Sequence, residues 1–237
     1  MISKKVKGRL LIVFFSGIFI LVGLITYAYA RTWGKTEIEF RIHINEELVL
    51  QSVYGESPTF AIWIQNPETS ETKTIFITNR AGIDDWEGKV DVPTALPAWD
   101  SVTRKGKQNE ESGMEVDAVT GATPLPGYFT TRARVRPGSR WTCWIEMNLA
   151  GDYNEHYKEF DEATKTTDEF GTGQPAIVYK AEIEAVNGNT VVPEVVGMSI
   201  LKEEGEIIQP MEGITNALDV FDDIAIVIVK PKLKIIN

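Results

Sequence analysis

Alternation of apolar and polar residues along the chain predicts a protein built from short β-strands. In residues 36–45, four apolar side chains lie on one face of an extended chain, and charged or polar side chains lie on the other. A period of two is the pattern of a strand with one buried face. Alternation, or a short apolar run, predicts further strands at 60–64, 73–77, 128–135, 141–148, 176–186 and 222–236.

Turn residues separate these predicted strands. Residues 66–70 predict a hairpin loop between the second and third strands. Residues 136–139 and 187–189 contain Pro-Gly and Asn-Gly pairs and predict two more hairpins. Only short segments such as 214–221 have a helical pattern. Strands of this number and length indicate an all-β fold, an antiparallel β-sandwich that is immunoglobulin-like in broad architecture.

The first thirty residues have the composition of an export segment. Four cations among residues 1–9 precede an uncharged run over residues 10–30. Residues 28–30, Ala-Tyr-Ala, offer a cleavage site, yet the run is also long enough to cross a bilayer, so a cleaved signal peptide and an uncleaved transmembrane anchor both stay open. The cations place residues 1–9 on the cytoplasmic side. Either outcome places one domain, residues 31–237, in the periplasm or at the cell surface.

Charge and cysteine content narrow the possible functions. The chain carries a formal charge of −10, and residues 31–237 hold 20 basic against 34 acidic side chains. An acidic surface repels phosphate backbones, so we expect no nucleic-acid partner. The single cysteine, Cys143, excludes an internal disulfide and a paired-cysteine redox site. Cys143 alternates with Trp141 and Ile145, which predicts a buried and inert thiol.

Residues 79–127 lack any periodicity and predict a long functional loop within the domain. The acidic run at 84–87 lacks the alternating oxygen ligands of an EF-hand, so we interpret it as a solvated turn. His43 and His156 likewise have no second histidine or cysteine at a spacing typical of metal ligands.

One stretch of this loop contains a side chain that could be chemically modified. Residues 117–124 have the sequence Asp-Ala-Val-Thr-Gly-Ala-Thr-Pro, and the prolines at its end keep the following chain out of a helix. The loop therefore presents a reachable hydroxyl at Thr123. An alternative interpretation is that the stretch is only a structural turn, in which Asp117 accepts a backbone N–H and Gly121 supplies a positive φ.

Residues 117–123 resemble the D-x-x-[ST]-G-A-[ST] sequence that periplasmic FMN transferases modify. This sequence is the acceptor site in the FMN-binding domains of the sodium-translocating NADH:quinone reductase and of Rnf-type electron-transport complexes. A chance match is expected in roughly one chain of this length per thousand. The resemblance implies that Thr123 carries FMN as a phosphoester and that Asp117 is the acidic recognition position. It also implies that small residues give the transferase access: Thr120, Gly121 and Ala122.

The wider chain lacks the α+β pattern of the FMN-binding domains. From about residue 60 to residue 185 it is similar to a family of exported proteins of unknown function, in which a β-sandwich carries this motif on a loop. The similarity includes residues 60–64, the motif, and the polar segment 146–154.

The resemblance therefore implies an extracytoplasmic flavoprotein that carries covalent FMN and transfers electrons in the cell envelope. Its partners would be an FMN transferase and a redox protein of the membrane or envelope. Trp99 and Tyr128, and also Trp86, are candidates to stack on the flavin. Two alternatives remain: a non-catalytic envelope module that binds protein or glycan through residues 79–127, and a calcium-stabilised adhesion-type domain.

Overall fold

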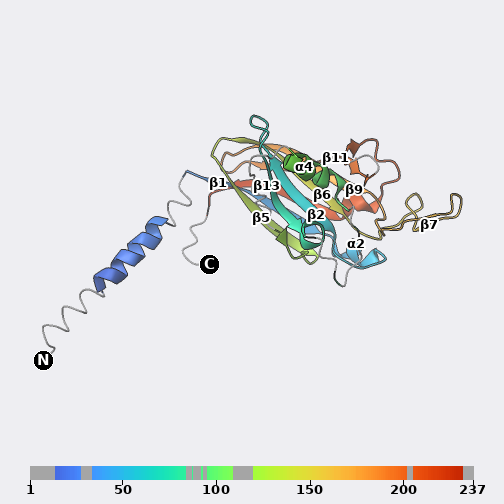
Figure 1. Cartoon of the computed structure of the whole chain (residues 1–237), viewed down its shortest axis with the longest axis horizontal. Coiled ribbons are helices and arrows are strands. Elements are labelled where there is room, and N and C mark those ends of the chain that lie inside the picture. The colour runs from blue at the N-terminus through green and yellow to red at the C-terminus, as the bar shows by residue number, and fades with distance from the viewer. Residues whose placement is uncertain are drawn as a thin grey trace, which may run out of the picture.

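The structure, a computed structural model, describes residues 14–27, 34–83, 87, 92, 95–108, 120–201 and 205–231. Residues 14–27 form a helix that extends away from one end of a β-rich domain (Figure 1). Among the described residues, no helix combines the length and the apolar character that a membrane span requires. Residues 1–13 and 28–30 of the predicted export segment lie outside the described residues.

Two facing sheets make up the described domain, and all but one of their strand pairs are antiparallel. The smaller sheet has the order β10 (Thr190–Val191), β13 (Phe221–Val229), β1 (Thr36–Ile44) and β5 (Gly127–Val135). The larger sheet has the order β12 (Ile207–Ile208), β11 (Glu194–Ser199), β9 (Ala176–Glu184), β6 (Arg140–Asn148), β2 (Thr59–Gln65), β3 (Thr72–Thr78) and β4 (Thr120–Gly121). A separate ribbon pairs β7 (Phe160–Asp161) with β8 (Thr166–Thr167). These two facing, mainly antiparallel sheets confirm the predicted β-sandwich.

The core lies between the two sheets and is built from the alternating apolar residues of their strands. The ring of Phe60 on β2 contacts the ring of Phe221 on β13 across the core, with centroids 5.3 Å apart. Cys143 lies in the same core, and burial raises the pKa of its thiol to about 12, as expected for an inert cysteine. The residues predicted to form the buried face of β1 are all fully buried here: Ile38, Phe40, Ile42 and Ile44.

Helices cover the outer face of the larger sheet, contrary to the expectation of a long loop and almost no helix. The segment 79–127 contains α3 (Asn79–Gly82), α4 (Pro97–Gln108) and β4, while α2 (Glu46–Gln51) and the 3₁₀ turn η2 (Asn216–Asp219) lie elsewhere. A second apolar cluster joins the outward residues of this sheet to α4 and to Val92, Ala95 and Leu96. Strand β2 is therefore buried on both faces.

A buried carboxylate holds the N-terminus of α4. Glu146 on β6 accepts hydrogen bonds from the backbone N–H groups of Ala98 at 2.9 Å and Trp99 at 2.7 Å. The hydroxyl of Ser199 on β11 donates to the same carboxylate. The first N–H groups of a helix have no partners within the helix, so Glu146 satisfies two of them. Burial raises the pKa of Glu146 to about 7.

Two of the predicted hairpins are wrong. The turn at 136–139 joins β5 of the smaller sheet to β6 of the larger one, and these strands do not pair. The turn at 187–189 likewise leads from β9 into β10, which pairs with β13. Turn residues specify where the chain reverses, but not which sheet the next strand joins. Only the hairpin of β2 and β3 is confirmed.

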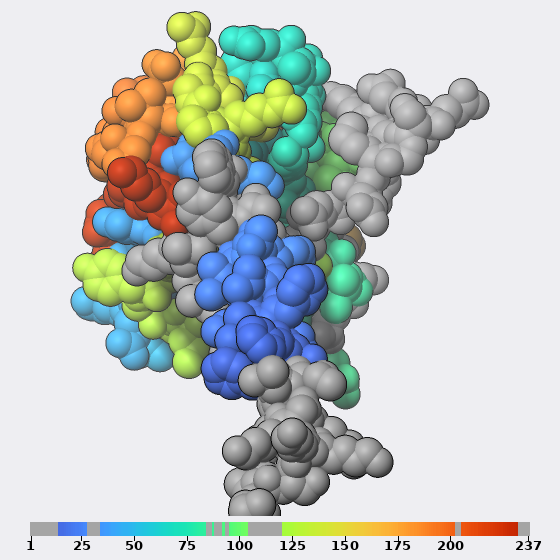
Figure 2. Space-filling model, turned by 90° about the vertical axis from the view of Figure 1, so that its left-hand side faces the viewer, coloured from blue at the N-terminus to red at the C-terminus, as the bar shows by residue number. Residues whose placement is uncertain are grey.

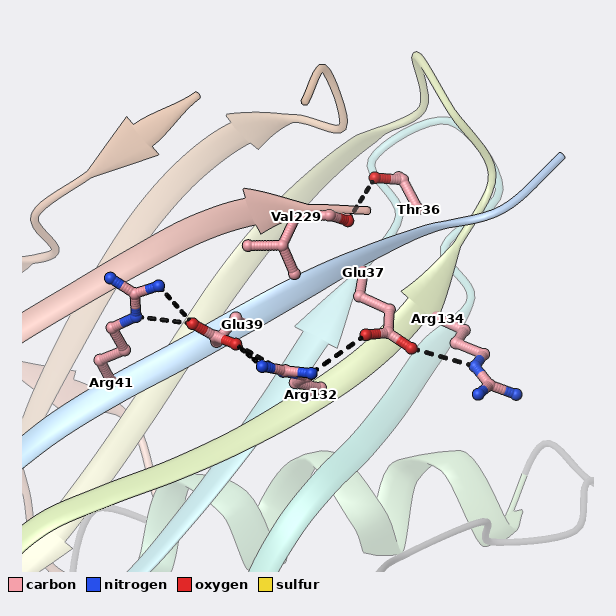
Figure 3. Close-up of polar contacts among 7 residues, drawn as sticks. All are labelled: Thr36, Glu37, Glu39, Arg41, Arg132, Arg134 and Val229. Carbon is pink, nitrogen blue, oxygen red and sulfur yellow. Dashed lines mark hydrogen bonds and ion pairs between the residues drawn. The ribbon is translucent and has the colours of Figure 1, made fainter. Parts of the chain in front are cut away.

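The outer face of the smaller sheet carries a ladder of ion pairs (Figure 3). Glu37 on β1 lies opposite Arg134 on β5, with the Nε and carboxylate oxygen 3.2 Å apart. Glu39 lies opposite Arg132 and also binds Arg41. The guanidinium of Arg132 reaches both glutamates. Burial alone would raise the pKa of Glu39, but hydrogen bonds from Arg41 and Arg132 outweigh burial and lower it. The pattern predicted an open polar face, whereas both glutamates are nearly buried beneath arginines.

Replacement of Glu146 by Gln should change how stability depends on pH. Because the folded-state pKa of Glu146 is raised from 4.5 to about 7, the folded protein binds more protons than the unfolded chain in this range. The contribution of Glu146 to the free energy of unfolding of the wild type therefore falls as pH rises from about 4.5 to about 7. Glu146→Gln lacks this component, so the stability difference between the proteins should shift by about 3 kcal/mol in favour of the variant across the window.

Urea unfolding at several pH values measures this difference. The other buried carboxylates are present in both proteins and cancel. A difference that shifts in favour of the wild type as pH rises would mean that the N-terminus of α4 stabilises the ionised carboxylate more than burial destabilises it.

Candidate functional site

The described part of the motif, residues 120–123, lies at the end of the sandwich opposite to the start of β1 and the end of β13. We call the end where β1 begins the terminal end, and the end where β1 finishes, at Ile44, the loop end. Figure 1 shows the helix of residues 14–27 leaving from the terminal end and α2 at the loop end. Gly127 pairs with Ile44, which places the start of β5 at the loop end.

Two motif residues form an edge strand of the larger sheet. Thr120 and Gly121 make up β4, which runs parallel to β3 and pairs with Ile77 and Thr78. Asp117 lies outside the described residues, so its predicted role in recognition stays a prediction. The motif is therefore partly fixed in the sheet rather than carried on a free loop.

Gly121 is required by close packing. A Cβ added there would lie 2.6 Å from Cε2 of Phe76, a core residue of β3. Its φ is not positive, so the alternative in which Gly121 supplies a left-handed turn is wrong. Thr120 is held in a similar way, because a Cβ added to Gly82 of α3 would lie 2.8 Å from the Thr120 methyl group. Both contacts press the motif strand against β3 and α3.

The connection from β4 to β5, residues 122–126, links the edges of the two sheets and holds Thr123. We call it the acceptor loop. Ala122 is exposed and Thr123 is half-buried. Within the described part of the chain, no hydrogen bond engages the Thr123 hydroxyl. Leu125 in the same loop is 83% exposed, which leaves an apolar side chain in water close to the motif.

A cluster of polar and aromatic side chains lies where the acceptor loop enters β5. Tyr128 is 80% exposed, and its ring contacts the ring of His43 with centroids 4.5 Å apart. Nδ1 of His43 lies 2.6 Å from the Oδ1 atom of Asp222 on β13. The sequence marked His43 as a solvated histidine and did not suggest Asp222. β1 pairs His43 with Tyr128 on β5 and with Asp223 on β13, and Asp222 lies beside it at an irregularity of the β1–β13 pairing.

Trp99 and Tyr128 lie on different sides of the sandwich. Trp99, on α4, covers the outer face of the larger sheet, and its Nε1 donates to Thr74 Oγ1 at 3.1 Å. Tyr128 lies on the outer face of the smaller sheet beside His43. The structure therefore does not bring the two stacking candidates together. Trp86 lies outside the described residues.

The polar segment 146–154 stabilises backbone rather than forming a reactive site. Nδ2 of Asn148 donates to the carbonyl oxygen of Gln174 at 2.9 Å, and the carboxylate of Asp152 accepts from the Gln174 backbone N–H at 2.7 Å. Burial raises the pKa of Asp152 to about 8. The Asn154 side chain accepts from the next turn and donates to the carbonyl oxygen of Gly213. The polar side chains of Glu146, Asn148, Asp152 and Asn154 thus each bond a backbone group.

Metal-binding geometry is not found among the described residues, where no group of three or more His, Cys, Asp or Glu side chains is arranged to hold an ion. Most of the acidic run at 84–87 lies outside those residues.

Comparison of the chain with protein-family models, with curated proteins and with solved structures finds no match.

Replacement of Gly121 by Ala should destabilise the fold through Phe76. The added Cβ would lie 2.6 Å from the ring, and overpacking of a dense core typically costs about 1–3 kcal/mol. Phe76→Leu removes the atoms that clash, so the cost of Gly121→Ala should be smaller in that background. Thermal or urea unfolding of the four proteins of this double-mutant cycle measures the coupling.

Ala122→Ser is the control, because Ala122 is exposed and its replacement should change stability by less than about 0.5 kcal/mol. Equal costs of Gly121→Ala in the two backgrounds would show that Phe76 is not the cause.

Proposed function

We propose that the protein is an extracytoplasmic electron carrier with FMN attached to Thr123 by a phosphoester bond. The observation that carries the proposal is the setting of the Thr123 hydroxyl. It has no hydrogen-bond partner among the described residues and lies in a loop fixed at both ends by sheet edges. A partly exposed threonine with a free hydroxyl, in a loop anchored at both ends, suits an acceptor that a second protein must bind.

The attachment needs a transferase, because a threonine hydroxyl is a weak nucleophile at neutral pH. With FAD as donor, the Thr123 oxygen forms a bond to the FMN phosphorus while the bond between the two FAD phosphates breaks. AMP leaves, and the hydroxyl proton passes to a base of the transferase. Export and modification support each other in this proposal, because both place Thr123 outside the cytoplasm.

The attached flavin would need an apolar surface to pack on. Tyr128 and Leu125 supply exposed side chains next to the acceptor loop in sequence. The ring contact with His43 holds Tyr128 on the sheet. We therefore favour Tyr128 as the stacking residue. Trp99 is on the other outer face, with its indole N–H already donated to Thr74.

The position of the acceptor loop favours a redox partner outside the membrane. β1 has nine residues and runs from the terminal end to the loop end. At a rise of about 3.3 Å per residue, the two ends are roughly 30 Å apart. If residues 10–30 anchor the chain in a membrane, an FMN on Thr123 would face the aqueous envelope. The expected immunoglobulin-like arrangement also stays a proposal, supported by the two facing antiparallel sheets.

Co-expression with a periplasmic FMN transferase tests the proposal. The wild type should gain the mass of one FMN and fluoresce as a denatured band in a gel. Thr123→Ser should still be modified, because it keeps a hydroxyl, whereas Thr123→Ala should lose both signals completely.

Thr130→Ala, an exposed threonine on β5, is the matched control and should be modified like the wild type. An absent mass increment in the wild type, or an increment kept in Thr123→Ala, would falsify the proposal and favour the non-catalytic binding module.

A further inference from the structure

A cavity of about 510 Å³ opens at the terminal end, far from the acceptor loop. It lies between the turn joining β2 to β3 and the turn joining β5 to β6. Figure 2 views this end of the molecule, where the first turn (cyan-green) and the second (yellow) lie side by side. The side chains that matter for its chemistry are Lys35, Glu71, Lys73, Arg134, Arg136 and Trp141.

The cavity concentrates positive charge on an acidic protein. Four cations and one carboxylate line it, although the whole chain carries −10. Lys73 pairs with the carboxylate of Glu71 at 2.8 Å, and Arg134 pairs with Glu37. Lys35 and Arg136 are exposed and form no ion pair with any described residue. Two of the four cations are thus left without a described carboxylate, and their positive potential would attract an anion.

The walls of the cavity are held in place by hydrogen bonds. Trp141 is only 4% exposed, and its Nε1 donates to Ser139 Oγ at 2.8 Å. The Ser139 hydroxyl donates in turn to the carbonyl oxygen of Arg136. On the opposite wall, the side-chain oxygen of Asn66 accepts the backbone N–H groups of Glu68 and Thr69. A cavity whose walls are already ordered costs little further ordering when a ligand binds.

We propose that this cavity binds phosphate groups. Guanidinium groups bind phosphate oxygens in pairs, and lysine ammonium groups add point charges, so two of each suit a group with up to two negative charges. The source is either a phospholipid headgroup or a soluble phosphate ester. Position favours the headgroup, because Lys35 follows the last described helical residue, Tyr27, by only eight residues. The site does not depend on flavin at Thr123.

The test uses the full chain in a neutral detergent and titrates it with pyrophosphate by calorimetry. Lys35→Gln/Arg136→Gln removes the two unpaired cations and should weaken binding about tenfold or more, because hydrogen bonds from charged donors to phosphate are stronger than neutral ones. Lys158→Gln/Lys165→Gln is the matched control, since it removes the same charge from exposed positions elsewhere. It should bind within about twofold of the wild type, because its changes leave the cavity intact.

A second arm identifies the source of the phosphate. The full chain is placed in vesicles of phosphatidylcholine, with or without phosphatidylglycerol, and amide hydrogen exchange is measured in residues 66–71 and 136–139. If phosphatidylglycerol slows exchange in the wild type and in the control variant, but not in Lys35→Gln/Arg136→Gln, the source of the phosphate is a lipid headgroup. Unchanged exchange together with pyrophosphate binding would identify a soluble ester.

The proposal is overturned if pyrophosphate does not bind at physiological ionic strength, or if the cavity variant and the control variant lose affinity equally. Unfolding temperatures of the two variants within a few degrees of the wild type exclude misfolding as the cause. Flavin attachment is measured separately, so failure of either proposal leaves the other intact.

Discussion

The contact on which the larger sheet depends is the one between the Glu146 carboxylate and the first N–H groups of α4. This sheet is apolar on its outer face, where Ala61 and Trp63 pack in one cluster with Val92, Leu96 and residues of α4. A sheet with two apolar faces needs a cover on each side. The smaller sheet covers one face, and α4 covers the other. Because Glu146 and Ser199 belong to β6 and β11, the carboxylate ties the cover to two strands.

The strands were predictable and their partners were not. Alternation fixed which residues of β1 face the core, because a period of two depends only on local geometry. The turn at 136–139 was equally clear, yet it links two sheets, since pairing depends on contacts distant in sequence. α4 was missed although Pro97 stands at its first position and Asp100 in its first turn, both typical of helix starts. Its stability comes from Glu146, almost fifty residues away.

In the candidate site, too, local features could be predicted from the sequence, whereas contacts between distant segments could not. The resemblance of residues 117–123 singled out Thr123, and the structure places it in a loop between two sheet edges. The packing of Gly121 on Phe76 could not be foreseen, because it requires knowing that β4 pairs with β3. The assignment of Trp99 and Tyr128 to separate faces depended on the position of α4. His43 and Asp222 were brought together by an irregularity in the pairing of β1 with β13, where His43 pairs with Asp223 and Ile44 with Phe221.

The pairing of β1 with β13 also determines how the domain responds to mechanical load. These strands are antiparallel neighbours, and Glu37 near the start of β1 pairs with Val229 at the end of β13. A pulling force between these two points acts across the strands and opens their hydrogen bonds one pair at a time. A force along the strands would load all of these hydrogen bonds together. A force across them is resisted at any moment by only one bond, which contributes about 1 kcal/mol. A domain tethered through β1 and pulled through β13 would therefore yield at low force.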